Sequence, residues 1–399
     1  MVKSSWKRLL SRRKILILGI SSATAIAMAA LSKFKLLGYP SDRFNPDRGK
    51  VFNYKARKFA VIGKRSLQER ARAKGILYGA FPQADRQKFA SNSQLQSSFI
   101  RECATITSGY YWTSTRPSIN TFNFDETDYF ADFAATNKLR LHGHPLVWHE
   151  ALPKWLPAIL ASENAQQILT NHIETVVGRY AGKVYSWDVV NEAINIGDKR
   201  SDGLRKTPWL EFLGVDYIDL AFQLAAKVDS QAKLVYNDFG VEYDTPEDGA
   251  KRDAVLNLLQ RLKSNGTPIY ALGLQSHLDG EKTSFNPQIF KQFLQNVASL
   301  GLKIMITELD VTDHKLPLDR KQRDNIIAGA YEDFLSTALA EKAVISVTSW
   351  GLSDRYTWLA DKKPRDDQAA VRPLPFDRNL KPKLAWNAIA RAFDRAPKR

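Results

Sequence analysis

Two glutamates follow two largely apolar segments of this sequence, and a pair of this kind could cleave an acetal bond. The first segment covers residues 184–190 and runs into Asn191-Glu192; the second covers residues 303–307 and runs into Glu308. Apolar runs of this length form buried strands, and a carboxylate buried without a partner is costly. Glycoside hydrolysis needs one carboxylic acid to protonate the leaving oxygen and one carboxylate to attack or to activate water. Each glutamate alone could also be a strand end held in a salt bridge, so the interpretation depends on the rest of the chain.

Short apolar segments alternate with longer helical patterns from residue 76 onward. Eight such segments begin 27 to 49 residues apart, without a Pro/Gly-rich linker or low-complexity tract between them. This alternation predicts a parallel sheet of the α/β class, and eight repeats predict a closed TIM (β/α)8 barrel over residues 67–399. The predicted strands are 76–80, 103–107, 140–144, 184–190, 233–237, 271–275, 304–307 and 345–349. The predicted helices are 130–137, 166–180, 218–228, 250–265, 287–300, 320–339 and 384–393.

Polar and aromatic residues follow several of the predicted strands, at the end of a barrel where the chemistry lies. Core packing has no need for Trp, His, Asn and Gln at these places. Sugars do, because their ring faces stack on aromatic side chains and their hydroxyls form directional hydrogen bonds. The residues are His144, Trp148, Asn191, Tyr236, Asn237, Gln275, His277, Trp350 and Trp358.

The sequence resembles glycoside hydrolase family 10, the barrel endo-xylanases, over residues 67–393. The motifs are G-H-x-L-V-W-H at 143–149, W-D-V-V-N-E at 187–192, Y-N-D at 236–238, Q-x-H at 275–277 and I-T-E-L-D at 306–310. The resemblance implies a retaining hydrolase of internal β-1,4 linkages in xylan or a related β-glycan, with no cofactor and no metal. Its two carboxyl groups are then expected about 5–5.5 Å apart.

The resemblance also implies a role for each residue. Glu192 is expected to be the general acid/base, which requires a raised pKa, and Glu308 the nucleophile. Asn191 is expected to hydrogen-bond the 2-hydroxyl of the reacting sugar. Asp310, on the same face as Glu308 if the strand continues, would orient the nucleophile together with His277. We expect the glycone side to be lined by His144, Trp148, Gln275, Trp350 and Trp358, and the leaving group to face Tyr236 and Asn237.

One segment departs from the family pattern. After the second strand the family carries T-x-E-N-x-M-K-W, whose Glu, Asn and Lys hold the second glycone sugar; this chain has Thr107, Ser108 and Tyr111 at those positions. Because sites that hydrogen-bond hydroxyls discriminate strongly, we expect an altered preference for a shorter, decorated or non-xylose β-glycan. The alternative is a non-catalytic, exported glycan-binding protein: the lost polar groups favour it, and the two intact glutamates argue against it.

The remaining histidines and the cysteine predict no further chemistry. We expect His142 to be a hydrogen-bonded core residue directed between barrel and helices. The spacing H-x-H-x4-H from residue 142 to 149 spans a strand end and a loop, so we expect no metal site. Cys103 is the sole cysteine, which excludes an intrachain disulfide.

The positive charge is confined to the start of the chain. Of 58 Lys/Arg and 42 Asp/Glu, residues 1–75 hold 19 and 3, which leaves 39 of each for the body. The high isoelectric point therefore does not indicate nucleic-acid binding. We expect a monomer whose partner is a polysaccharide or oligosaccharide.

Residues 1–32 resemble a twin-arginine export signal. The stretch Ser11-Arg12-Arg13-Lys14 precedes an uncharged run with small residues near its end, and an uncleaved membrane anchor is the alternative interpretation. We expect a periplasmic or extracellular protein. Residues 33–66 are predicted to be a basic tether, which could associate with a membrane or cell wall or be a solvated linker.

Overall fold

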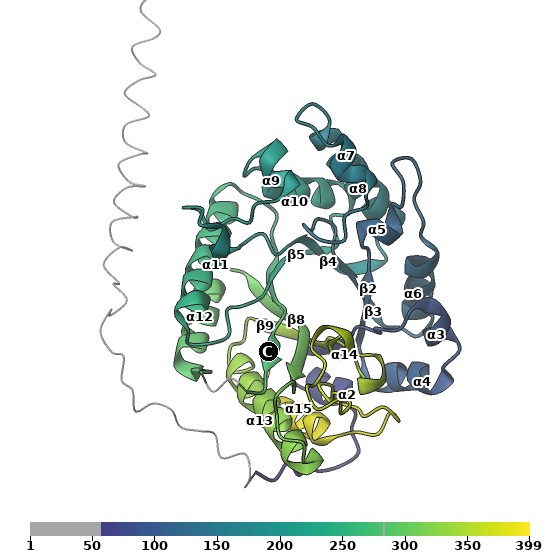
Figure 1. The fold of residues 1–399 in the computed structure, drawn as a ribbon, viewed down its shortest axis with the longest axis vertical. Helices are drawn as coiled ribbons and strands as arrows, with labels where there is room; N and C mark the ends of the chain where they lie inside the picture. The colour runs from purple at the N-terminus through teal and green to yellow at the C-terminus, as the bar shows by residue number, and fades with distance from the viewer. Residues whose placement is uncertain (1–56, 282–283) are drawn as a thin grey trace, which may run out of the picture. The chain divides into compact units, whose positions relative to one another are not determined.

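Nine parallel strands form one sheet in the computed structural model, which describes residues 57–281 and 284–399. The strand order is β6-β5-β4-β3-β2-β1-β9-β8-β7, and an additional β6–β8 pairing closes eight of the strands into a barrel. Figure 1 shows the helices arranged around these strands. The predicted (β/α)8 barrel is confirmed. The strands are β1 (Leu77–Ala80), β2 (Thr105–Gly109), β3 (Arg140–His144), β4 (Val184–Asn191), β5 (Lys233–Asp238), β6 (Ala271–Leu274), β7 (His277–Asp279), β8 (Lys303–Thr312) and β9 (Val344–Ser349).

Local capping signals decide where several helices begin. Thr207, Thr245 and Asn286 each accept a backbone hydrogen bond with their side chain and are followed by proline at the first helical position. This pairing satisfies a free N–H group and pre-sets the helical φ angle. The longer helices are α4 (Ser93–Glu102), α6 (Asp125–Thr136), α8 (Ala165–Arg179), α10 (Tyr217–Val228), α11 (Pro246–Ser264), α12 (Pro287–Ser299), α13 (Arg320–Ala338) and α15 (Leu384–Arg395). The short ones are α2 (Leu67–Arg72), α3 (Arg86–Ala90), α5 (Trp112–Thr115), α7 (Trp155–Ile159), α9 (Pro208–Leu213), α14 (Leu359–Lys362), η3 (Ile196–Asp198) and η4 (Asp354–Tyr356).

The helix between β1 and β2 is the one long helix that the sequence pattern did not predict. Helix α4 buries only Leu95 and Phe99 as apolar contacts, four residues apart on one face. Its other positions are polar except for the exposed Ile100, so its apolar stripe is too sparse to distinguish from a loop.

Strand β8 continues well past the predicted residues 304–307. It reaches Thr312, and its second half pairs with β7, so that His277 lies opposite Asp310. The extension keeps Glu308 and Asp310 on one continuous strand. Alternate residues of a strand share a face, so both carboxylates point toward the same side of the barrel.

The beginning of the described chain packs on the barrel. Nη1 of Arg57 lies 2.7 Å from Oδ1 of Asp333 on α13, and Phe59 is buried. Residues 57–66, predicted to belong to the tether, therefore contact the barrel domain. The predicted export signal and the rest of the tether lie outside the described residues. Among the helices of residues 57–281 and 284–399, none combines the length and the apolar character that a membrane crossing requires.

Candidate active site

Glu192 and Glu308 both lie at the carboxyl ends of barrel strands, with 9% and 4% of their surface exposed. Glu192 directly follows β4 and has a left-handed backbone with φ 58°, which is strained for a residue with a side chain. Its N–H donates to the carbonyl of Asn237 at 2.8 Å, and Nε of Arg205 donates to its carbonyl at 2.7 Å. These two bonds hold the turn that directs the carboxylate into the barrel mouth.

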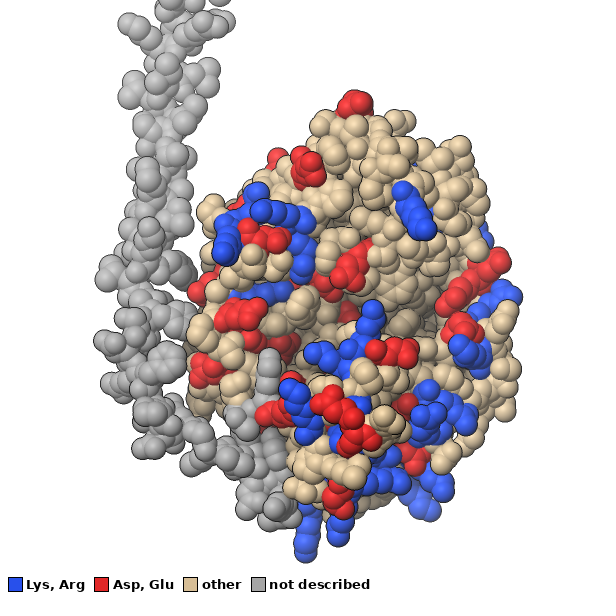
Figure 2. Space-filling view, in the orientation of Figure 1, with Lys and Arg blue, Asp and Glu red and all other residues tan. Residues whose placement is uncertain are grey.

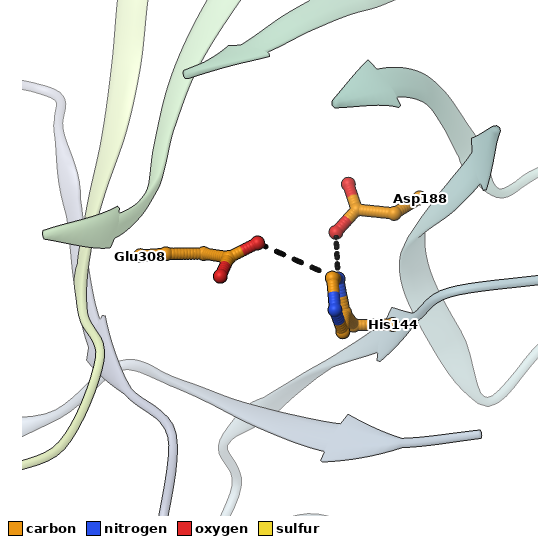
Figure 3. A group of neighbouring side chains, drawn as sticks. All are labelled: His144, Asp188 and Glu308. Atoms are coloured by element: carbon orange, nitrogen blue, oxygen red, sulfur yellow. Dashed lines mark hydrogen bonds and ion pairs between the residues drawn. The ribbon is translucent and has the colours of Figure 1, made fainter. Parts of the chain in front are cut away.

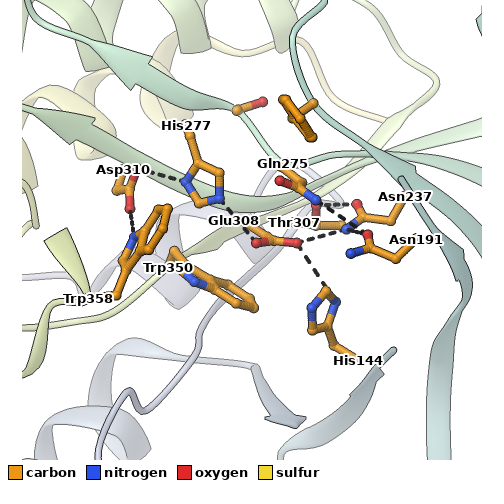
Figure 4. Close-up of polar contacts among 12 residues, drawn as sticks. His144, Asn191, Asn237, Gln275, His277, Thr307, Glu308, Asp310, Trp350 and Trp358 are labelled. Carbon is orange, nitrogen blue, oxygen red and sulfur yellow. Dashed lines mark hydrogen bonds and ion pairs between the residues drawn. The ribbon is translucent and has the colours of Figure 1, made fainter. Parts of the chain in front are cut away.

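Three side-chain amides connect the two carboxylates, and Figure 4 shows these amides beside Glu308. Nδ2 of Asn237 donates to Oε1 of Glu308 at 2.8 Å and to Oδ1 of Asn191 at 2.9 Å. Nε2 of Gln275 contacts the same Asn191 oxygen at 3.3 Å and donates to Oε1 of Glu192 at 2.9 Å. The predicted acid and nucleophile are therefore brought together in one buried hydrogen-bonded network.

His277 lies between Glu308 and Asp310, as the sequence predicts. Its Nδ1 is 2.9 Å from Oδ1 of Asp310 and its Nε2 is 3.2 Å from Oε2 of Glu308. Burial opposes a charged imidazole, but the Asp310 charge and the hydrogen bonds to both carboxylates outweigh it and raise the pKa of His277 to about 10. The imidazolium thus donates to both carboxylates at neutral pH. Nε1 of Trp358 donates to the second oxygen of Asp310 at 2.8 Å and fixes its orientation.

A second histidine approaches Glu308 from the other side (Figure 3). Nδ1 of His144 is 2.8 Å from Oδ2 of Asp188 and 3.8 Å from Oε1 of Glu308. Burial opposes the charged ring, whereas Glu308 and Asp188 favour it, and the pKa of His144 is raised. Potential metal-ligand atoms of these three residues lie within 4.8 Å of one another. The Asp188 hydrogen bond already occupies Nδ1, so a metal ion there would have to displace it.

The predicted direction of His142 is wrong. Its Nδ1 is 2.7 Å from Oγ of Ser186 and its Nε2 is 3.0 Å from the same Asp188 oxygen that contacts His144. His142 and His144 are two residues apart and share a face, so both point into the barrel rather than toward the helices. His142 is nevertheless the buried, hydrogen-bonded histidine that the sequence led us to expect. Burial acts against the Asp188 anion, but both histidines outweigh it and hold its pKa at about 2.

Glu192 has the electrostatic environment of a general acid. Burial is the largest effect and raises its pKa; the hydrogen bond from Gln275 and the nearby indole of Trp148 oppose it, and the Asp238 and Glu308 charges add to it. Nδ1 of His149 lies 3.9 Å from Oε2 of Glu192. Because burial and Arg205 lower the pKa of His149 to about 4, this ring is neutral at pH 7 and does not favour the Glu192 anion.

Aromatic rings surround the two carboxylates. Trp350 packs on Phe81, with 4.5 Å between ring centroids, and stands edge-on to His144 at 5.2 Å. Trp358 lies 5.0 Å from the ring of His277. Trp350 is buried and Trp358 is half-buried, and their role as a glycone wall stays a prediction.

Tyr111 closes the place where the family pattern would have a lysine. Its ring centroid is 5.8 Å from His144 and 6.0 Å from Trp148. Thr107 and Ser108 are fully buried, and the hydroxyl of Thr107 has no hydrogen-bond partner among the described residues. The two small hydroxyls therefore do not replace the Glu and Asn side chains that the family pattern has at these positions. The ring of Tyr111 takes the place of the family's lysine beside His144 and Trp148.

Tyr236 does not face the site, contrary to the expectation that it contacts the leaving group. It is fully buried, and its hydroxyl donates to Asp238, which also forms an ion pair with Nζ of Lys251 at 2.7 Å. Adjacent residues on a strand point to opposite faces, so Asn237 points inward and Tyr236 outward. Asn237, which was also expected to face the leaving group, donates directly to Glu308, the predicted nucleophile.

Sequence reasoning missed residues that fix the orientation of the site's side chains. Oγ1 of Thr307 donates to Oδ1 of Asn237 at 2.7 Å, which forces the amide nitrogen toward Glu308. A Cβ on Gly273 would lie 2.4 Å from the same oxygen, so glycine leaves the room that Asn237 needs. Asp188 and Arg205 complete this group. Asp188 and Thr307 stand inside the quoted motifs, as polar residues within apolar strands, and that signal could have identified them.

Comparison with known proteins identifies the family of the chain. Residues 66–392 match the family model described as glycosyl hydrolase family 10. The chain is 35% identical over 292 residues to a Beta-1,4-xylanase of Dictyoglomus thermophilum, covering 70% of this chain and 78% of that protein. It is also 35% identical to Endo-1,4-beta-xylanase 2 of Claviceps purpurea, covering 69% and 75%.

The fold is similar to that of solved xylanases. Native xylanase 10B from Thermotoga maritima superposes with a TM-score of 0.74 at 31% identity, covering 82% of this chain and 98% of that one. Xylanase 10B from Thermotoga petrophila RKU-1 in complex with xylobiose gives 0.74 at 30% identity, covering 84% and 99%. The matched span includes both glutamates and every residue of the network between them, and the chain belongs to glycosyl hydrolase family 10.

Proposed function

We propose that this protein hydrolyses internal β-1,4 linkages of xylan or a related β-glycan with retention of configuration. Glu192 is the general acid/base and Glu308 the nucleophile. The observation that carries the proposal is the amide network of Asn191, Asn237 and Gln275, which connects two buried carboxylates held in different states. One has a raised pKa, and the other accepts hydrogen bonds from an imidazolium and an amide.

In the first step, a carboxylate oxygen of Glu308 attacks the anomeric carbon as the bond to the leaving oxygen breaks. Glu192 gives its proton to that oxygen, and a glycosyl ester on Glu308 remains. Asn237 and His277 hold the attacking carboxylate in position, which reduces the entropy lost in reaching the transition state. Asn191 stands between the two glutamates, where its free amide hydrogen can reach the sugar 2-hydroxyl.

In the second step, water attacks the same carbon from the side that the leaving group vacated. Glu192, now a carboxylate, takes a proton from that water, and Glu308 leaves as a carboxylate. Two displacements at one carbon return the original configuration. The change of protonation fits Glu192, because its pKa is raised by burial and by the Glu308 charge, and the charge is lost when Glu308 is esterified.

The substrate class follows from the family and from the printed names of the relatives, which are xylanases. The departure at Thr107, Ser108 and Tyr111 supports a preference for a shorter, decorated or non-xylose β-glycan. We also propose that the protein acts outside the cytoplasm, on the basis of residues 1–32.

The test is product stereochemistry and dependence on both glutamates. Proton NMR of freshly hydrolysed xylo-oligosaccharide should show the β-anomer first. Glu308→Gln should lower reducing-sugar release from xylan by at least about 10⁴-fold while substrate binding by calorimetry persists. If the wild type binds β-glycans but releases no sugar from xylan, mixed-linkage glucan or cell-wall glycans, the protein is a glycan-binding module instead.

A further inference from the structure

A cavity of about 690 Å³ shares Trp358 with the active site. While the indole nitrogen of Trp358 donates to Asp310, its side chain also lines this cavity, together with Arg355, Tyr356 and Arg378. Gln83, which also lines the cavity, donates from Nε2 to the carbonyl of Trp350 at 2.9 Å. The cavity is thus joined to the predicted glycone wall through both tryptophans, and its volume lies in the range of small-ligand sites.

Three of the six charged residues that line the cavity are already paired. Nζ of Lys88 lies 2.8 Å from Asp85, and Oδ2 of Asp354 lies 2.8 Å from Nζ of Lys383. Arg365 forms an ion pair with Asp367. These groups stabilise the cavity wall and have little charge left for a ligand.

Three charged side chains of the lining have no ion pair with another described residue. They are Arg355 and Arg378, both exposed, and Asp361, which is exposed on α14. Two cations against one anion leave the cavity with a positive excess. Figure 2 shows Lys and Arg side chains interspersed with Asp and Glu side chains around the position that α14 has in Figure 1.

The cavity and the catalytic centre both contain residues with left-handed backbone angles. Gln83 and Gln368, which both line the cavity, have left-handed φ angles of 57° and 59°. In the active site, Glu192 and Ser276 have φ angles of 58° and 60°. Side-chain-bearing residues adopt this conformation at a cost and are concentrated at ligand sites.

We propose that this cavity binds the carboxylate of a uronic acid residue carried by the glycan whose backbone occupies the active site. The inference rests on the proposed function and names the kind of decoration that the substrate bears. Guanidinium groups bind carboxylates through two parallel hydrogen bonds, and Arg355 and Arg378 are the two groups free to do so. Trp358 packs against the sugar ring that connects the backbone to the acidic substituent.

The experiment compares two substrates of equal backbone length, a linear xylo-oligosaccharide and the same oligosaccharide with one glucuronic acid substituent. For the wild type, kcat/KM should be higher on the acidic substrate by about three- to tenfold at low salt, as two exposed ion pairs imply, and the difference should shrink at 0.5 M NaCl. In the double variant Arg355→Gln/Arg378→Gln the difference should disappear, while kcat/KM on the neutral substrate stays within twofold.

Lys362→Gln is the matched control, because it removes an exposed charge on α14 that does not line the cavity. It should keep the preference for the acidic substrate. This inference is overturned if the wild type has the same kcat/KM on both substrates, or if the double variant still prefers the acidic one. Either result leaves the proposed function intact. A wild type that cleaves neither substrate contradicts the proposed function itself.

Discussion

Asn237 donates a 2.8 Å hydrogen bond from Nδ2 to Oε1 of Glu308. An amide can present either its nitrogen or its oxygen, and here the neighbouring Thr307 hydroxyl decides, because it donates to the amide oxygen. The nucleophile therefore depends on a residue that touches no substrate. This arrangement also explains why Gly273 stands beside it, where a methyl group would collide with the same oxygen.

Thr307→Val should impair catalysis without removing the fold. The substitution keeps the shape of the side chain but leaves the buried oxygen of Asn237 without its donor, which costs about 1–3 kcal/mol of stability. The amide is then free to turn, and kcat should fall about tenfold with little change in KM. Thr307→Ser is the control and should retain most of the activity. If Thr307→Val keeps its activity and Thr307→Ser loses it, methyl packing rather than the hydrogen bond is responsible.

Gln275→Ala should shift the alkaline side of the pH profile. Glu192 must be protonated to act as an acid, so kcat/KM falls as pH rises through its pKa. The hydrogen bond from Gln275 favours the ionised form and lowers that pKa. Its removal should raise the pKa of Glu192 and move the alkaline limb of kcat/KM to higher pH, whatever happens to the maximal rate. A limb that stays in place or moves to lower pH would contradict this assignment.

Asp310→Asn should flatten the dependence of stability on pH in the alkaline range. The folded-state pKa of His277 is about 10 and its unfolded value about 6.5, so the proton stabilises the fold. This contribution is complete below pH 6.5 and is lost as pH rises toward 10; it is on the order of a few kcal/mol. Without the Asp310 charge the pKa of His277 falls. Urea unfolding at pH 7 and pH 9.5 should then differ less in the variant than in the wild type.

Tyr111→Lys should change the preference for glycone length. The ring of Tyr111 packs between His144 and Trp148, where the family pattern places a polar group that holds the second sugar. A lysine restores a donor and opens space, so the ratio of kcat/KM for xylotetraose over xylobiose derivatives should rise severalfold. Tyr111→Phe keeps the ring and should leave the ratio unchanged. Melting temperatures of both variants separate this effect from loss of the fold.

The barrel and its two glutamates could be predicted because their signals are local. Seven predicted strands overlap the observed ones closely, and Arg140–His144 agrees at both ends. Other strands, such as Ala271–Leu274, are buried on both faces and stand out in the sequence as short apolar runs. A carboxylate at the end of such a run, such as Glu192 or Glu308, is costly to bury and therefore indicates a functional role. The helix α4 lacked this kind of signal and was missed.

The contacts among the strand ends depend on closure of the barrel. Pairing of β6 with β8 and the long extension of β8 bring His277 opposite Asp310, although 33 residues separate them. The direction of each side chain follows from the register, which turned His142 inward and Tyr236 outward, against expectation. Residue types and spacing could therefore identify which side chains perform the chemistry. Only the closed barrel decided which of them meet, because strand neighbours and faces are set by long-range pairing that no local pattern encodes.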